Sequence, residues 1–200
     1  MCSSDLRINE AGTRIILDVL TRVGIKKFVF YSSVAVYGDV DGTAGEDSPL
    51  TPSNDYGESK LAAERLIQPW AAADPGRQVL VVRPTVVFGP HNYANMYRLI
   101  DNIARHRFLL VGKGDNIKSV SYVENLVAGT LFLIDRLAPG YAAYNYADYP
   151  HHTARQLVDV ITDALGYRRL NWHLPLKPVL FAAGAIDWLA RVTRINFPIT

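Results

Sequence analysis

A tyrosine and a lysine one helical turn apart are the sharpest chemical feature of this sequence. Tyr56 and Lys60 are separated by Gly-Glu-Ser, and residues i and i+4 share one face of a helix. A nearby ammonium group favours the phenolate and moves the pKa of a phenol from about 10 toward physiological pH. A phenol tuned in this way can take a proton from an alcohol or return one to a ketone. The pair therefore predicts a site of alcohol oxidation or ketone reduction.

A hydroxyl partner for this phenol is expected at the end of a strand. Residues 26–31 form a short aromatic and β-branched run typical of a buried strand. Ser32 and Ser33 follow it directly. Ligands of parallel α/β sheets bind at the carboxyl edge of the sheet. We therefore expect Ser33 to hold the substrate oxygen beside Tyr56.

Alternating helices and strands must position these residues. Helical spacing of apolar residues predicts helices over 14–20, 53–73, 95–105, 125–135 and 153–165. Short apolar runs predict strands over 26–31, 78–84, 108–111, 120–123 and 143–146. Gly24 is the expected C-cap of the first helix, and Thr153 is the expected N-cap of the last. Because a helix separates the first two strands, they must run parallel, and the fold class is α/β.

Composition and charge exclude several classes of protein. The 200 residues are 49% hydrophobic and 20% charged, which is globular composition. The net charge of +2 offers no strong field for nucleic acid. The charge is uneven: residues 1–75 carry seven basic and eleven acidic side chains, residues 76–150 eight and five, and residues 151–200 six and three. The single cysteine, Cys2, excludes an internal disulfide and fits a reducing cytoplasm, where we expect the protein to reside.

We expect neither a membrane span nor a metal site. The longest apolar candidate, Val179–Ile186, is about half the length that a membrane helix needs. It is expected to be a short buried or interfacial helix. Three histidines, His91, His151 and His152, lack a carboxylate or cysteine at ligand spacing.

Several runs, taken together and in order, resemble one known family. The chain is similar to the extended short-chain dehydrogenase/reductase superfamily, in its NAD-dependent epimerase/dehydratase branch. The matching runs cover about residues 9–150: Asn9-x-x-Gly12-Thr13, residues 28–38, Tyr56 to Lys60, Arg83-Pro84 through Gly89-Pro90, Gly112-Lys113-Gly114, and Tyr122-Val123-Glu124-Asn125.

The resemblance implies a role for each matching residue. It makes Ser33 the substrate-hydroxyl partner, Tyr56 the proton-transfer residue, and Lys60 its modulator and a ribose ligand. The positions implied to contact NAD, with NADP not excluded, are Tyr31, Ser32, Tyr56, Lys60, Pro84 and Thr85. The positions implied to contact substrate are Ser33, Val34, Val86 and Lys118. Lys118 falls where many relatives place an arginine on the substrate diphosphate, and Val86 falls where many place an asparagine.

The resemblance also implies an incomplete fold. Family members open with a strand and a Gly-x-x-Gly-x-x-Gly turn that seats the dinucleotide pyrophosphate, and this sequence contains no such turn. We therefore expect the C-terminal part of a Rossmann-like doubly wound parallel sheet over residues 1–90 and 119–148. A small α/β substrate-binding subdomain is expected over residues 91–118 and 149–200.

One further departure indicates the reaction. The dehydratases of this family place an Asp-Glu pair where this sequence has Val34 and Ala35, so loss of water is disfavoured. The function expected is NAD(P)-dependent epimerisation of a nucleotide-activated sugar through a transient ketone. One alternative is a dehydrogenase or reductase of a small alcohol, ketone or sterol. A second alternative, favoured by the missing glycine turn, is a truncated, non-catalytic binding module.

The resemblance implies a homodimer built on a four-helix bundle. Two helices fit this role, because each carries more apolar residues than one sheet face requires. The first offers Ile15, Ile16, Leu17, Val19 and Leu20, and the second offers Leu61, Ala62, Leu66 and Ile67.

Overall fold

The computed structural model of the protein describes residues 7–169. The chain divides into two compact units. The first comprises Met1–His91 and Ser119–Tyr149, and the second comprises Asn92–Lys118 and Pro150–Thr200. The predicted helix over Val179–Ile186 lies outside the described residues.

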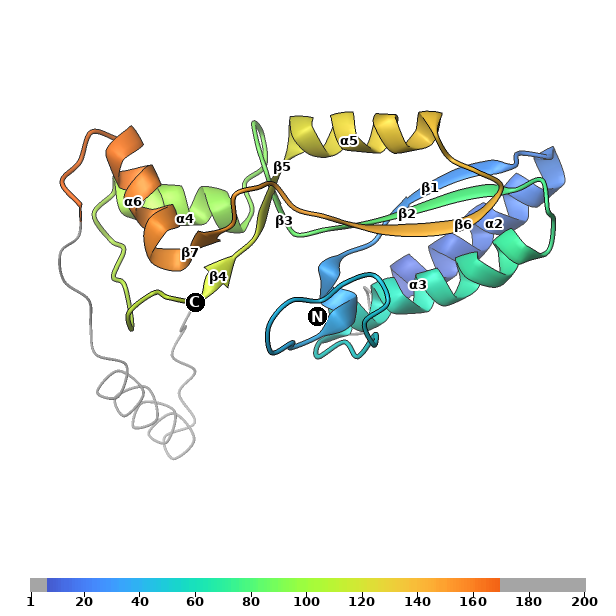
Figure 1. Ribbon diagram of the computed structural model, residues 1–200, viewed down its shortest axis with the longest axis horizontal. Coiled ribbons are helices and arrows are strands. Elements are labelled where there is room, and N and C mark those ends of the chain that lie inside the picture. Colours follow the sequence, from blue (N-terminus) through green and yellow to red (C-terminus); the bar gives the residue numbers. More distant parts are fainter. Residues whose placement is uncertain (1–6, 170–200) are drawn as a thin grey trace. The chain divides into compact units, whose positions relative to one another are not determined.

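A three-stranded parallel sheet forms the centre of the first unit (Figure 1). Its strands stand in the order β1 (Lys27–Tyr31), β2 (Gln78–Pro84) and β6 (Gly140–Tyr146). The parallel pairing of β1 with β2 confirms the predicted β-α-β unit. In the middle strand, residues 79–82 are completely buried, as expected for apolar residues of a strand covered on both faces.

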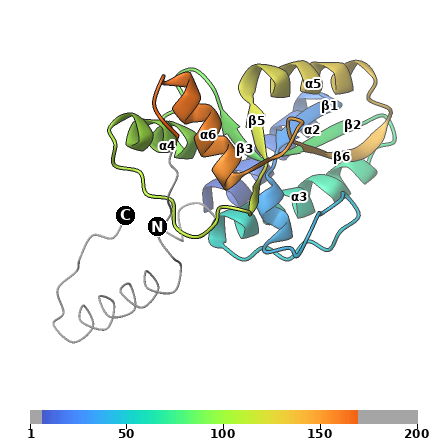
Figure 2. The same ribbon diagram turned by 60° about the vertical axis from the view of Figure 1, so that its left-hand side comes forward.

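Helices cover both faces of this sheet (Figures 1 and 2). Helices α2 (Gly12–Val23) and α3 (Asp55–Ala72) lie on one face, and α5 (Val123–Asp135) lies on the other. Because side chains alternate along a strand, Val79 and Val81 pack toward α2 and α3, whereas Leu80 and Val82 pack toward α5. Burial of each such side chain stabilises the unit by about 1.5–3 kcal/mol.

Shorter elements complete the first unit. A π-helical turn, η1 (Arg7–Ala11), precedes α2, and a 3₁₀ turn, η2 (Val34–Tyr37), follows β1. Strand β3 (Val86–Phe88) pairs in parallel with β5 (Val120–Tyr122). Gly24 ends α2 in the left-handed conformation, with φ of 73°, which confirms it as the C-cap.

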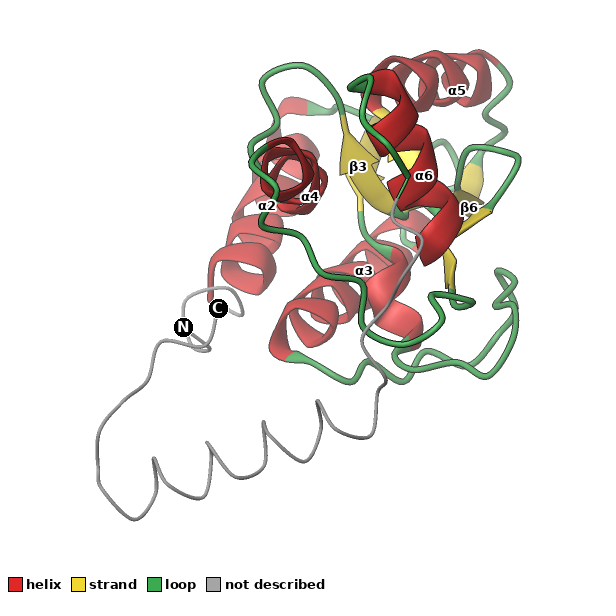
Figure 3. Cartoon of the chain, turned by 90° about the vertical axis from the view of Figure 1, so that its left-hand side faces the viewer, coloured by secondary structure: helices red, strands yellow, loops and turns green. Residues whose placement is uncertain are grey.

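The second unit is small and mixed. It contains α4 (Asn95–Ala104) and α6 (Ala154–Ala164), which pack together (Figure 3), and the antiparallel strands β4 (Ile117–Lys118) and β7 (His152–Thr153). The Thr153 side chain caps α6 as predicted. Its hydroxyl accepts from the Gln156 amide, and the Gln156 side chain accepts in return from the Thr153 amide at 2.8 Å.

The strand predicted over residues 108–111 is wrong. Residues 108–110 have no regular structure, and Val111 makes an isolated bridge. Only Leu110 of this run is buried, while Leu109 and Val111 are exposed. A short apolar run makes a strand only when a neighbour pairs with it along its length, and this run has no such neighbour among residues 7–169. No helix within these residues is long and apolar enough to cross a membrane.

Candidate active site

The end of β1 places Ser33 at the carboxyl edge of the sheet. The Ser32 amide donates to the Val82 carbonyl at 2.8 Å, which extends the pairing of β1 with β2 by one residue. Ser33 then begins η2, and its Oγ accepts a hydrogen bond from the Ala35 amide at 3.2 Å. This contact uses an acceptor site of the hydroxyl and leaves its proton available to a ligand.

Tyr56 lies in the first turn of α3, and Lys60 lies one turn later. The Asn54 side chain caps the helix by accepting from the Gly57 amide at 2.9 Å. Tyr56 is 45% exposed, whereas Lys60 is partly buried. The Lys60 ammonium lies 5.9 Å from the centroid of the Tyr56 ring. The predicted helical pairing of the two side chains is therefore present.

The main chain of β1 holds the Lys60 side chain. Its Nζ donates to the Tyr31 carbonyl oxygen at 3.0 Å and lies 5.1 Å from the centroid of the Phe30 ring. Burial lowers the pKa of the Lys60 amine below its usual value. An ammonium group has three donors, and the Tyr31 contact uses one of them.

Close packing brings the Ser33 turn against the Tyr56 turn. A Cβ on Gly57 would lie 2.4 Å from the Ala35 carbonyl oxygen and 2.9 Å from the Pro52 Cβ. Only glycine permits this approach without a shift of main chain. Gly57 follows Tyr56 in sequence and Ala35 lies two residues after Ser33, so the structure brings these two predicted segments together.

Two hydrogen bonds at the buried Ser59 hydroxyl hold the main chain of Tyr56 in place. Ser59 is completely buried, and its Oγ donates to the Tyr56 carbonyl oxygen at 2.7 Å. Asn9, in η1, donates from its side-chain amide to the same Ser59 oxygen at 2.9 Å. The sequence does not predict the contact between Asn9 and Ser59, because 50 residues separate them.

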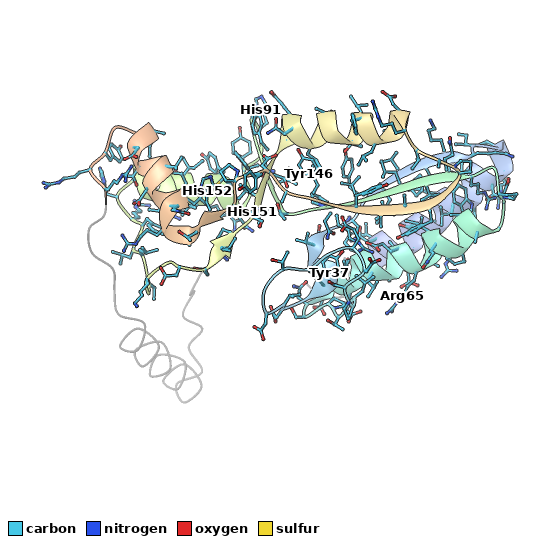
Figure 4. All side chains as sticks on the ribbon, in the orientation of Figure 1. Tyr37, Arg65, His91, Tyr146, His151 and His152 are labelled. Carbon is cyan, nitrogen blue, oxygen red and sulfur yellow. The ribbon has the colours of Figure 1, made fainter. Side chains whose placement is uncertain are left out.

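The other predicted cofactor positions lie in the same unit. The Tyr31 hydroxyl donates to Thr130 Oγ1 on α5 at 2.9 Å. Ser32 is buried, and its hydroxyl has no hydrogen-bond partner among the described residues. Pro84 ends β2, and Thr85 donates from its amide to the Tyr146 carbonyl at 3.0 Å. Figure 4 shows Tyr146 on the α5 side of the sheet.

The predicted substrate positions divide between the two units. Val34 packs against a small core formed by Val36, Tyr37 and Leu61. Val86 is the exposed first residue of β3 in the first unit. Lys118 belongs to the second unit, where it is exposed on β4.

Lys60 lies between the main chain of Tyr31 and the ring of Tyr56. Tyr31 and Tyr56 are about equally exposed, at 41% and 45%, but Lys60 bonds to the main-chain carbonyl of Tyr31, whose own hydroxyl donates to Thr130. The partly buried Lys60 ammonium keeps two of its three donors for other partners. Among the described residues, no three His, Cys, Asp or Glu side chains gather as a metal site.

A buried ion pair near this site was missed from the sequence. Arg83 donates from Nε to Glu64 Oε1 at 3.1 Å and from Nη2 to Oε2 at 2.6 Å, and both side chains are 4% exposed. Burial lowers the pKa of the Arg83 guanidinium, but the hydrogen bonds and charge of Glu64 outweigh that effect and raise it. Arg83 Nη1 also donates to the Tyr37 hydroxyl at 2.7 Å.

A cavity of about 470 Å³ opens on this ion pair. Its lining comes from α3, from β2 and β6, and from the loop that precedes α3: Glu46, Asp47, Leu50, Leu61, Glu64, Arg65, Gln68, Arg83, Tyr141 and Ala143. Ser33, Tyr56 and Lys60 are not part of the lining. In Figure 4, Tyr37 and Arg65 mark the α3 side of the sheet where the cavity lies.

Comparison with known families decides what this arrangement is. The family model described as "NAD dependent epimerase/dehydratase family" matches residues 3–147, which is more than half of the chain. The chain belongs to this family. The family is NAD-dependent, and the structural neighbours of the chain give its parallel sheet a Rossmann-like fold.

Similar members of the family include epimerases and dehydrogenases. An N-acetyl-alpha-D-glucosaminyl-diphospho-ditrans,octacis-undecaprenol 4-epimerase from Escherichia coli O157:H7 is 36% identical over 194 residues, 96% of this chain. A UDP-glucose 4-epimerase from Vibrio cholerae and a mouse sterol-4-alpha-carboxylate 3-dehydrogenase are each 28% identical, over 84% and 93% of the chain. The chain spans 59%, 52% and 54%, respectively, of the lengths of these relatives.

Solved structures agree with this assignment. MoeE5, in complex with UDP-glucose and NAD, is 26% identical and superposes with a TM-score of 0.72. The superposition covers 85% of this chain and 57% of MoeE5. RMD from Pseudomonas aeruginosa, complexed with NADPH, is 28% identical with a TM-score of 0.70, and covers 86% of this chain and 62% of RMD.

Proposed function

We propose that the whole protein is an NAD-dependent 4-epimerase of a sugar joined to a diphosphate carrier. The observation that carries this proposal is the exposed Tyr56 phenol in the first turn of α3, with the partly buried Lys60 ammonium beside it. The 4-epimerases among the relatives act on UDP-glucose and on a polyprenol-linked N-acetylglucosamine. Both names describe a sugar attached through a diphosphate, which is the substrate class that we assign.

Three side chains act on the sugar hydroxyl, each in a different role. Ser33 donates its free hydroxyl proton to the sugar oxygen and holds that oxygen in place. The Lys60 ammonium stabilises negative charge on Tyr56, which takes the hydroxyl proton as the alcohol becomes a ketone. Tyr56 returns the same proton when the alcohol re-forms. Bound NAD would accept the hydride from the sugar carbon and give it back to the opposite face.

The residues after Ser33 favour epimerisation over dehydration. Val34 and Ala35 occupy the positions where the resemblance places an acid and a base in dehydratases. Val34 packs in an apolar core and Ala35 receives the close approach of Gly57. Neither side chain can exchange a proton with the sugar, so loss of water from the ketone is disfavoured.

The remaining predicted positions complete the proposal. Tyr31, Ser32, Pro84 and Thr85 border the nicotinamide end of NAD, or of NADP. We assign Val86 and Lys118 to substrate, with Lys118 supplying positive charge to the diphosphate, although as a single point charge rather than the two-pronged fork of an arginine.

A second candidate is a dehydrogenase or reductase with the same three residues and no return of hydride. The similarity to the mouse sterol dehydrogenase supports it. The test is to incubate the whole protein with NAD and UDP-N-acetylglucosamine, and separately with the undecaprenol-linked sugar. We expect the C4 epimer by nuclear magnetic resonance and no accumulation of NADH. NADH formed in proportion to product would establish the dehydrogenase, and no turnover of any substrate class would favour a binding module.

A further inference from the structure

One guanidinium group joins three segments of the first unit that are far apart in sequence. Arg83, on β2, makes two hydrogen bonds to Glu64 on α3 and one to Tyr37 at the end of η2. The Tyr37 hydroxyl in turn donates to the Asn145 side chain on β6 at 2.8 Å. The main-chain amide of Asn145 donates to Glu46 Oε1 at 2.9 Å, which extends the network to the loop before α3.

Each segment that Arg83 joins also carries a residue of the candidate active site. Glu64 lies four residues after Lys60, on the next turn of the same helix. Tyr37 ends the 3₁₀ turn that Ser33 begins. Arg83 itself immediately precedes Pro84 at the end of β2. In each of the three segments, the residue of the network is therefore at most four positions in sequence from Ser33, Lys60 or Pro84.

We propose that Arg83 is a positioning residue, whose guanidinium sets the relative placement of Ser33, Lys60 and Pro84. The kinetic test of this inference rests on the proposed function. The structural test does not depend on it. A flat group with hydrogen-bond donors on three nitrogens in fixed directions can hold a carboxylate and a phenol at defined angles. An apolar side chain of the same size fills the space but fixes no direction.

The competing interpretation is that the ion pair only supports the fold. Buried ion pairs often contribute little net stability, and well-packed apolar replacements can preserve or raise it. The double variant Arg83→Met with Glu64→Leu therefore separates the two roles. A fold-only role predicts a stable protein with normal turnover, whereas a positioning role predicts a stable protein with reduced turnover.

The kinetic test uses the whole protein with its substrate. We expect the double variant to unfold cooperatively, to keep its KM within about threefold, and to lose about 10²-fold in kcat, as small misplacements of reacting groups do. The matched control is Lys26→Met with Asp74→Leu, which removes a partly exposed ion pair of the same unit and should leave kcat unchanged. Unchanged kcat in the Arg83 double variant, or loss of its cooperative unfolding, would overturn the proposal.

The cavity beside the ion pair allows a rescue experiment. In Arg83→Ala, the lost side chain enlarges a cavity that is already lined by Glu64, so free guanidinium can occupy the vacated place. We expect millimolar guanidinium to restore at least about tenfold of the lost kcat. Ammonium, which has the charge without the planar fork, should restore little. Equal rescue by both ions, or by neither, would contradict a directional role for Arg83.

The structural test needs no activity and uses this chain alone. Hydrogen exchange followed by mass spectrometry should show faster exchange at residues 34–38 and 54–60 in the double variant. Exchange in α2, which does not contact Arg83 in the network, should match the wild-type chain. If the wild-type whole protein shows no epimerase activity, this result still decides the role of Arg83. Unchanged exchange at both site segments would overturn the proposal whatever the enzyme does.

Discussion

The Nζ of Lys60 donates a hydrogen bond to the carbonyl oxygen of Tyr31 at 3.0 Å and thereby ties helix α3 to the carboxyl end of strand β1. This contact holds the ammonium 5.9 Å from the centroid of the Tyr56 ring, and Tyr56 is 45% exposed. The arrangement suits a group that must accept and return one proton many times without moving.

Turnover of the whole protein should depend on the Tyr56 hydroxyl. Tyr56→Phe keeps the ring but removes the transferable proton, and positioned acid–base groups contribute about 10²–10⁴-fold. We expect kcat to fall by that factor, measured as epimer formed per unit time. Tyr144→Phe, which removes another exposed tyrosine hydroxyl of the same unit, is the control. A Tyr56→Phe variant that retains more than about half of wild-type turnover would exclude this role.

Gly57 should tolerate no side chain. A Cβ there would meet the Ala35 carbonyl oxygen at 2.4 Å, so Gly57→Ala must push α3 away from the Ser33 turn. We expect a loss of about 1–3 kcal/mol of unfolding free energy, as for overpacked cores, measured by urea denaturation. Gly12→Ala, where nothing lies within 4 Å of the added methyl group, should be neutral or slightly stabilising. Equal stability of the two variants would show that α3 and η2 are not closely packed.

Stability above pH 10 should depend on Tyr141. Burial, followed by the charge of Glu64, raises the pKa of Tyr141 to about 12, against about 10 in an unfolded chain. The folded state therefore keeps the proton longer, and its advantage is complete below about pH 10 and lost as the pH rises through about 12. Tyr141→Phe should lose less stability over this interval than the wild type does. Parallel stability curves for the two proteins would contradict the raised pKa.

The outer face of α2 is the surface on which we expect two copies of the whole protein to associate. Ile15, Ile16 and Val19 are exposed, at 63%, 47% and 49%. The part of this prediction that used Leu17 of α2 and Leu61 and Ile67 of α3 is wrong, because all three are buried within the unit's own core.

The test of that surface is the mass measured by light scattering. We expect a dimer at tens of micromolar for the wild type and a monomer for Ile15→Glu, because a charge at the centre of an apolar contact is poorly solvated. The exposed Arg22 lies on the same helix, and Arg22→Glu serves as the control that should remain dimeric. A wild-type monomer at this concentration would end the proposal.

The features predicted from sequence are those that depend on local spacing. The i, i+4 relation of Tyr56 and Lys60 needs only a helix, and the capping of α6 by Thr153 needs only the first turn of that helix. Both contacts join residues at most four positions apart, so they can be predicted once the helix itself is predicted.

The features that were missed depend on how distant elements pack. Arg83 and Glu64 are 19 residues apart, and their pairing follows from α3 crossing β2 on one face of the sheet. Asn9 and Ser59 meet only because η1 packs against α3. Likewise, the apolar run at 108–111 lacks a partner along its length, which only the tertiary structure reveals.

The most direct test of the central claim follows one hydrogen atom. The whole protein, with NAD, is given UDP-N-acetylglucosamine or its undecaprenol-linked counterpart carrying deuterium at C4, and the product is examined by mass spectrometry and nuclear magnetic resonance. We expect the C4 epimer to retain deuterium at C4, with none released to solvent or to free NADH, because the ketone is reduced before it leaves Tyr56. Product that has lost the deuterium, or a ketone that accumulates with reduced cofactor, would contradict epimerisation through a transient ketone.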